Sequence, residues 1–191
     1  VITLADKMDA GLVLAQSRRV LDPMTTAGEL HDTLAADGPA LVESVLARHA
    51  AGERWGEEQV ESLVTIAPKM SKGDGVIDFA SAAACQRRIH GFNPWPGVTM
   101  TLLADPAQPG QLVELKLLRA TTLCLFAPHG KSAGEAIAPA DGTFACADGS
   151  ALQLLEVQPA GKRAMKWADF ARGRALSPSA RFVPRSPGVA P

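Results

Sequence analysis

The chain has 191 residues, of which 20% are charged and 5% aromatic, and none is tyrosine. This length allows one full domain or two small ones with a buried core, and the composition is that of a folded rather than a disordered protein. No apolar run approaches 18 residues, which excludes a transmembrane helix. The chain starts at Val1 with a pattern typical of a domain interior, so we expect it to be a C-terminal fragment.

The formal net charge of −1 hides an asymmetry along the chain. Residues 1–65 contain 5 basic and 11 acidic side chains, whereas residues 66–191 contain 14 basic and 9 acidic ones. An acidic first part joined to a basic second part indicates that only the second part meets a polyanion. A solvated basic face without any partner explains the same counts equally well.

Cysteine and histidine usage indicates neither a disulfide framework nor a metal site. The three cysteines are widely separated and form no Cys-x-x-Cys pair, which is typical of free and mostly buried thiols in a reducing cytosol. The four histidines have no ligand spacing, so we interpret them as surface or packing residues. The residues concerned are Cys85, Cys124, Cys146, His31, His49, His90 and His129.

The first two predicted strands enclose a loop with a candidate catalytic carboxylate. The apolar runs 1–4 and 12–14 predict short strands joined by a polar loop. Asp9 lies in this loop near Gly11, where backbone or ligand can approach closely. Carboxylates in such loops often carry chemistry, but they are even more often plain turn residues.

The segment after residue 25 has the pattern of a helical hairpin or a broken helix. Thr26, with Glu29 three positions later, forms a capping box that starts a helix. The pattern breaks at Gly38, and Pro39 suits the first turn of a second helix. An apolar stripe on that helix would pack on a sheet. The stripe consists of Leu41, Val42, Val45 and Leu46.

A change of character between residues 50 and 75 indicates an exposed link. Its end, residues 68–75, is a loop that glycine makes mobile, and this loop carries Lys69 and Lys72. We place the domain boundary in the range 60–75.

A rigid corner follows a predicted helix that Ser81 caps and that carries Arg87 and Arg88. Residues 92–97 read Phe-Asn-Pro-Trp-Pro-Gly, so two prolines bracket Trp95 and fix φ twice within three residues. Each residue before a proline is disfavoured in the helical region, and the final glycine permits a turn. This pattern favours a structural corner, with Trp95 as a packing residue, over a binding surface.

After the corner, short strand-like segments alternate with Pro-, Gly- and Asp-rich separators. This punctuation predicts a small closed or partly open β-barrel, with a hairpin turn at residues 148–149. A Gly-Lys-Arg loop at 161–163 and a short helix with Trp167 and Phe170 follow, and from residue 177 we expect a poorly ordered tail. The predicted strands are 99–103, 112–120, 135–138, 143–146 and 152–157.

Over residues 1–173 the chain resembles the C-terminal part of the methionyl-tRNA formyltransferase family. The resemblance depends most on the Asn-Pro-Trp-Pro-Gly corner followed by the Gly-Lys-Arg loop. Phe79 departs from the family, which usually has tryptophan there, but this change preserves packing. The other matching pieces are Met8-Asp9-Ala10-Gly11, Thr26 with Glu29 and Leu30, Ala67-Pro68-Lys69-Met70-Ser71-Lys72, Ile77-Asp78, and Met165, Asp169, Phe170 and Gly173.

The resemblance implies an α+β chain. Residues 1–60 would be the remnant of a Rossmann-like formyltransferase domain and residues 61–75 a linker. Residues 76–175 would form an OB-like β-barrel that binds tRNA, and residues 176–191 a disordered tail.

The resemblance further implies formyl transfer from 10-formyltetrahydrofolate to the amino group of initiator methionyl-tRNA, without a metal. The family uses an Asn, a His and an Asp to deprotonate the amine and to stabilise the oxyanion. Asp9 matches the Asp. The only asparagine is Asn93, in the corner, and no Asn-x-His or Ser-Leu-Leu-Pro motif is present. We therefore expect this chain to be inactive by itself.

Basic residues of the linker and the barrel are the candidates for tRNA contact, and each could equally be a plain solvent-facing charge. We expect a cytoplasmic monomer with no membrane partner. A sugar-nucleotide formyltransferase and a non-enzymatic RNA-binding barrel are the alternative interpretations. The candidate tRNA-binding residues are Lys69, Lys72, Arg87, Arg88, Lys162 and Arg163.

Overall fold

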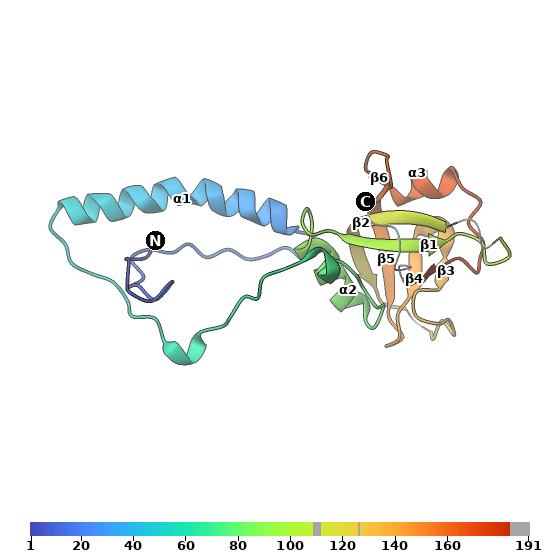
Figure 1. Cartoon of the computed structure of the whole chain (residues 1–191), viewed down its shortest axis with the longest axis horizontal. Helices are drawn as coiled ribbons and strands as arrows, with labels where there is room; N and C mark the ends of the chain where they lie inside the picture. The colour runs from blue at the N-terminus through green and yellow to red at the C-terminus, as the bar shows by residue number, and fades with distance from the viewer. Residues whose placement is uncertain (109–111, 126, 184–191) are drawn as a thin grey trace. The chain divides into compact units, whose positions relative to one another are not determined.

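The computed structural model describes residues 1–108, 112–125 and 127–183 (Figure 1). The chain divides into two compact units. The first unit comprises Val1–Asp22 and Gly28–Lys69, and the second comprises Pro23–Ala27 and Met70–Pro191. In the described residues, no helix combines the length and the apolarity that a membrane crossing requires.

The first unit is held by isolated backbone bridges and one long helix. Bridges join Ile2 to Val13 and Val13 to Glu57, and the 3-10 helix η1 covers Glu61–Leu63. The predicted strands 1–4 and 12–14 were therefore wrong as strands. Each run is too short to extend its pairing beyond a single bridge, and stable sheets need several strands with a shared apolar face.

The helix α1 spans Ala27–Ala50 without interruption, so the predicted break at Gly38 was wrong. Pro39 lies inside the helix and leaves one carbonyl of the preceding turn without its usual N–H partner. A residue before proline avoids helical geometry because its Cβ meets the proline ring, and Gly38 has no Cβ. Of the predicted apolar stripe, only Val45 is buried.

The second unit is a nearly closed antiparallel barrel, as the strand pattern predicted. Its sheet has the order β3-β4-β5-β2-β1-β7, with β6 paired to β5. A bridge between Glu135 and Arg181 joins the two outer strands of this order. The strands are β1 (Val98–Leu103), β2 (Leu112–Leu123), β3 (Ala136–Ala138), β4 (Thr143–Ala145), β5 (Ala151–Pro159), β6 (Met165–Lys166) and β7 (Arg181–Val183).

Short helices complete the barrel unit. The helix α2 (Ala82–Gly91) begins where Ser81 accepts a hydrogen bond from the Ala84 amide, and it packs on β2. The helix α3 (Trp167–Arg172) ends at Gly173. Both helices occur where the sequence predicts them. Two 3-10 turns, η2 (Lys72–Asp74) and η3 (Pro139–Asp141), lie before α2 and β4 respectively.

Aromatic rings fill one part of the barrel core. Phe79 stacks on Phe182 with ring centroids 5.3 Å apart, and Phe144 meets Trp167 edge-on at 5.4 Å. Phe79 is buried, and the interpretation that phenylalanine in place of tryptophan preserves packing at this position stays a prediction. Buried aromatic pairs of this kind stabilise beyond their area alone.

The tail differs from the expectation of disorder over its described part. Residues 181–183 form β7 against β1, and the Phe182 amide donates to the Gly134 carbonyl at 2.9 Å. Phe182 is buried in the aromatic cluster, so apolar burial orders a segment whose Pro- and Ser-rich composition predicts disorder. Residues 184–191 of the predicted tail lie outside the described residues.

Candidate nucleic-acid interface

The corner between α2 and β1 is fixed by hydrogen bonds to its own ends and to β2. The Gly97 amide donates to the Phe92 carbonyl at 2.8 Å, and the Asn93 side chain donates to the Leu118 carbonyl at 3.0 Å. The Asn93–Pro94 and Trp95–Pro96 peptide bonds are cis. Trp95 is 54% exposed, so its interpretation as a packing residue was wrong. The prolines fix the backbone, but they do not bury the ring between them.

The lysine-bearing loop packs directly on this corner. A Cβ on Gly75 would lie 2.0 Å from the Gly97 carbonyl oxygen, so the close approach requires glycine at position 75. The Thr99 amide donates to the Gly75 carbonyl at 2.9 Å. Ser71 and Asp74 form a capping box around η2, and hydrogen bonds from the backbone and side chain of Ser71 lower the pKa of Asp74. These contacts hold Lys72 beside the corner.

Lys116 on β2 places a further positive charge next to the corner. Its ammonium donates to the Pro94 carbonyl at 2.9 Å, and its chain lies over Gly97, whose added Cβ would be 2.3 Å from Lys116 Cε. In the sheet register Lys116 faces Thr99 on β1 and Gln158 on β5. Lys116 is not among the residues that the sequence predicts for tRNA contact, although its place between buried leucines in an alternating strand marks it as outward-facing.

The Gly-Lys-Arg loop, residues 161–163, follows β5, the strand that pairs with β2 at Lys116. The Gln158 side chain donates to the Lys162 carbonyl at 2.9 Å, and Gln158 pairs with Lys116. The loop is also tied to β2, because the Ala160 amide donates to the Glu114 carbonyl at 3.2 Å. Lys162 and Arg163 are exposed. Together these contacts define a basic row, which consists of Lys72, Arg88, Lys116, Lys162 and Arg163.

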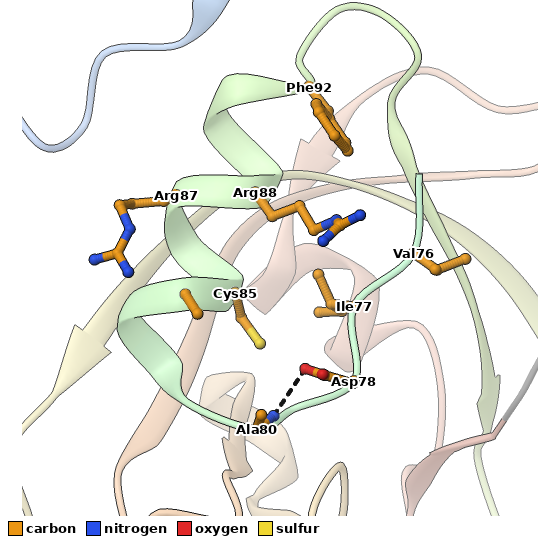
Figure 2. A pocket seen from close by; sticks show the side chains of 9 residues that line it. Val76, Ile77, Asp78, Ala80, Cys85, Arg87, Arg88 and Phe92 are labelled. Atoms are coloured by element: carbon orange, nitrogen blue, oxygen red, sulfur yellow. Dashed lines mark hydrogen bonds between the residues drawn. The ribbon is translucent and has the colours of Figure 1, made fainter. Parts of the chain in front are cut away.

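The two arginines of α2 take different directions. Figure 2 shows Arg88 extending across a pocket toward the segment with Val76, whereas Arg87 extends to the other side of the helix. Arg88 Nε donates to the Asp74 carbonyl at 3.1 Å, and its guanidinium lies 5.2 Å from the centre of the Phe92 ring. Arg88 is thereby tied to the Lys72 loop and belongs to the basic row, and Arg87 does not.

The pocket beneath Arg88 has a volume of about 560 Å³. Asp78 at its edge accepts a hydrogen bond from the Ala80 amide at 2.9 Å (Figure 2), and Cys85 lines its wall.

Cys85 and Cys146 are buried, Cys124 is exposed, and all three are free. A hydrogen bond with Cys146 lowers the pKa of Cys85, and the same contact together with burial raises the pKa of Cys146.

His90 is a packing residue, as predicted. It is buried, its Nε2 accepts from the Ala120 amide at 3.1 Å, and its Nδ1 lies 2.9 Å from the Pro23 carbonyl. This pattern requires the neutral tautomer with the proton on Nδ1. Within the described part of the chain, no three His, Cys, Asp or Glu side chains gather in a way that could hold a metal ion.

Asp9 and Lys69 belong to the first unit. Asp9 is exposed and has a φ of 59°. Its loop is fixed by Gln59, which donates to the carbonyls of Asp9 and Gly11 at 2.6 and 2.8 Å. A Cβ on Gly11 would lie 1.8 Å from the Thr3 carbonyl oxygen. These contacts support the backbone of the loop and leave Asp9 exposed to solvent. Gln59 carries no sequence signal for this role.

Comparison with known proteins identifies the family of the chain. Residues 69–175 match the family model described as formyl transferase, C-terminal domain. Methionyl-tRNA formyltransferases from Bradyrhizobium sp. (strain BTAi1) and Myxococcus xanthus are 38% and 33% identical over 92% and 94% of this chain. These matches cover 55% and 54% of the relatives, so the chain spans about half the length of the curated relatives it matches.

Solved structures show the same fold. HypX from Aquifex aeolicus, solved in complex with tetrahydrofolic acid, superposes with a TM-score of 0.59 at 17% identity, covering 89% of this chain and 29% of HypX. The sequence resemblance to the C-terminal part of methionyl-tRNA formyltransferases is thereby confirmed. The chain belongs to the formyl transferase family, whose C-terminal domain forms its barrel.

Proposed function

We propose that this chain is part of an enzyme that transfers a formyl group from 10-formyltetrahydrofolate to the amino group of initiator methionyl-tRNA in the cytoplasm. The observation that carries the proposal is the similarity to methionyl-tRNA formyltransferases at 33–38% identity over most of the chain. The complex of HypX, a protein of the same fold, with tetrahydrofolic acid supports a folate as the formyl donor. We propose a monomer, with no metal and no membrane partner.

The two units would serve different steps. We assign residues 1–60 to a Rossmann-like catalytic domain, residues 61–75 to a linker, and residues 76–175 to the tRNA-binding barrel. Asp9 would orient a histidine and a water for removal of the amine proton, a role for which its exposed, rigidly held loop is suited. Because the chain has no Asn-x-His motif, we propose that it does not catalyse the transfer alone.

The basic row and Arg87 in the barrel unit, together with Lys69 of the first unit, would hold tRNA through phosphate contacts. Lys72, Lys162 and Arg163 are exposed. Lys116 pairs with Thr99, which bonds to the Gly75 carbonyl of the Lys72 loop, and with Gln158, which bonds to the Lys162 carbonyl. Adjacent cations of this kind neutralise phosphates and give an affinity that depends on salt and only weakly on sequence.

Salt titration of tRNA binding tests this role. The double variant Lys72→Ala with Lys162→Ala should bind tRNA more weakly, and the slope of log affinity against log salt should flatten by roughly 1.4 to 1.8, the loss of about two phosphate contacts. Lys131→Ala is the matched control, because Lys131 pairs with Glu135 outside the basic row. An unchanged slope in the double variant would exclude the phosphate contacts, and stronger binding to a nucleotide sugar than to tRNA would favour a sugar-nucleotide formyltransferase.

The variant Lys69→Ala with Lys72→Ala tests the linker separately. Both lysines are exposed and lie on either side of the division between the two units. We expect weaker tRNA binding and a flatter salt slope here too.

A further inference from the structure

Trp95 differs from the other two tryptophans of the chain. The indole N–H of Trp55 donates to the Leu14 carbonyl at 2.8 Å, and Arg48 covers its ring at 4.0 Å. The indole N–H of Trp167 donates to the Pro139 carbonyl at 2.8 Å, and the ring is buried. Trp95 is 54% exposed, and among the described residues its indole makes no hydrogen bond or ring contact. Since large aromatic side chains in folded proteins are mostly covered, this ring is free to meet a ligand.

The backbone under Trp95 is held in place before any ligand arrives. The corner has prolines at 94 and 96, each with a fixed φ. Its ends are joined by the bond from the Gly97 amide to the Phe92 carbonyl at 2.8 Å, and Asn93 ties it to Leu118 on β2. Because this backbone is already ordered, binding has to fix only the side-chain torsions of Trp95, and this favours affinity.

The surroundings of Trp95 are positively charged. The Lys116 ammonium lies 2.9 Å from the carbonyl of Pro94, the residue directly before Trp95, and one contact leaves two of its three donors free. The loop of Lys72 packs on Gly97, and Arg88 is tied to that loop. An exposed ring beside several cations is the arrangement by which proteins bind single-stranded nucleic acid, with bases stacked on the aromatic face and phosphates on the cations.

We propose that Trp95 stacks on an unpaired base of the bound RNA while Lys116 contacts a neighbouring phosphate. This inference rests on the proposed function, since it names how the barrel engages tRNA. It also assigns different roles in RNA binding to the basic row and to Trp95. The basic row supplies salt-dependent affinity for any phosphate backbone, and Trp95 selects segments in which a base is not paired.

Binding of a 12-nucleotide single-stranded RNA and of a blunt-ended RNA duplex to the whole chain tests the proposal. Trp95→Ala should weaken binding of the single strand by roughly 5- to 150-fold, the range of one lost base stack, without changing the salt slope. Duplex binding should change much less. Trp95→Phe should lose less than Trp95→Ala, because a smaller ring still stacks. Lys116→Ala should instead flatten the salt slope by about 0.7.

Indole fluorescence gives an independent measurement. A stacked base should quench the emission of Trp95, so single-stranded RNA should quench the wild type and the matched control Trp55→Phe but not Trp95→Phe. Circular dichroism checks that each variant is folded. Wild-type affinity of Trp95→Ala for the single strand, or unchanged quenching in Trp95→Phe, would overturn the proposal.

The outcome for tRNA separates this inference from the proposed function. A wild type that binds the single strand through Trp95 but has no affinity for tRNA would contradict the proposed function and keep the stacking role. Salt-dependent tRNA binding that is indifferent to Trp95→Ala would keep the function and remove the stacking role.

Discussion

Different kinds of interaction stabilise the two units of the chain. In the barrel unit, apolar side chains from every long strand are fully buried, among them Leu102, Leu117 and Leu152. In the first unit, Val45 is the only buried hydrophobic side chain among the described residues, whereas others such as Leu4 and Ile66 are almost fully exposed. An apolar sequence therefore does not by itself make a core. The side chains must also converge on one another.

The first unit is ordered mainly by polar contacts. Gln59 fixes the Asp9 loop, Arg19 bonds to Asp37 on α1, and the indole of Trp55 donates to the Leu14 carbonyl. Each such contact contributes little net free energy when it is exposed to water. We therefore expect the barrel unit to unfold cooperatively. The stability of the first unit should depend on single polar contacts and on solvent conditions such as pH and salt.

The largest expected effect is a cavity in the barrel core. Phe144→Ala removes a fully buried ring that contacts Phe79, Phe182 and Trp167, and it should lower the free energy of unfolding by about 3–5 kcal/mol. The matched change in the first unit, Leu46→Ala, truncates a 60% exposed side chain and should stay within about 0.5 kcal/mol. Urea unfolding followed by circular dichroism measures both.

Equal effects of these two substitutions would contradict the contrast between the units. A large loss in Leu46→Ala would mean that the stripe on α1 is covered in solution. A small loss in Phe144→Ala would mean that the aromatic cluster does not carry the stability of the barrel.

A smaller loss of stability is expected from replacing a glycine at a position where the surrounding backbone leaves no room for a Cβ. In Gly11→Ala the new Cβ would lie 1.8 Å from the Thr3 carbonyl oxygen, so the Asp9 loop must shift at a cost of about 1–3 kcal/mol. In the control Gly91→Ala, at the end of α2, the Cβ meets nothing within 4 Å. That control should be neutral or stabilise by up to about 1 kcal/mol. Trypsin cleavage at Lys7 should accelerate only in Gly11→Ala, and equal cleavage rates would refute the requirement for glycine.

The sequence predicted the barrel better than the first unit, for physical reasons. Strands such as β1 and β5 have local signals, an alternating apolar pattern bounded by turn residues. β7 has none, because its order comes from β1 and Gly134, which are distant in the sequence. In the first unit the runs 1–4 and 12–14 have strand-like composition, but they lack the neighbouring strands that would extend them.

The candidate site was predictable only in part. Motif positions located Lys72, Lys162 and the corner, but their convergence depends on the sheet register through Lys116 and Gln158. The exposure of Trp95 could not be read from the prolines around it, because they fix backbone angles and do not determine burial.

The smallest effects on stability are expected from replacing one carboxylate in each unit. Asp148 accepts hydrogen bonds from the side chain and backbone of Ser150 in the β4–β5 turn, and these lower its pKa. Asp37 has a lowered pKa chiefly because Arg19 hydrogen-bonds to it. Since both values lie below that of the unfolded chain, about 4, each stabilising contribution is present above about pH 4 and is lost as the pH falls through the folded value.

Asp148→Asn and Asp37→Asn should each lower the urea midpoint slightly at about pH 6, and the difference from the wild type should shrink as the pH falls below about 4. The dependence of these stability effects on salt should distinguish the two variants. At about 1 M NaCl the screening length is about 3 Å, so the effect of Asp37→Asn should shrink, because its partner is the charged Arg19. The effect of Asp148→Asn should persist, because its partner Ser150 is neutral. Identical salt responses would mean that the first unit does not depend on its exposed ion pairs.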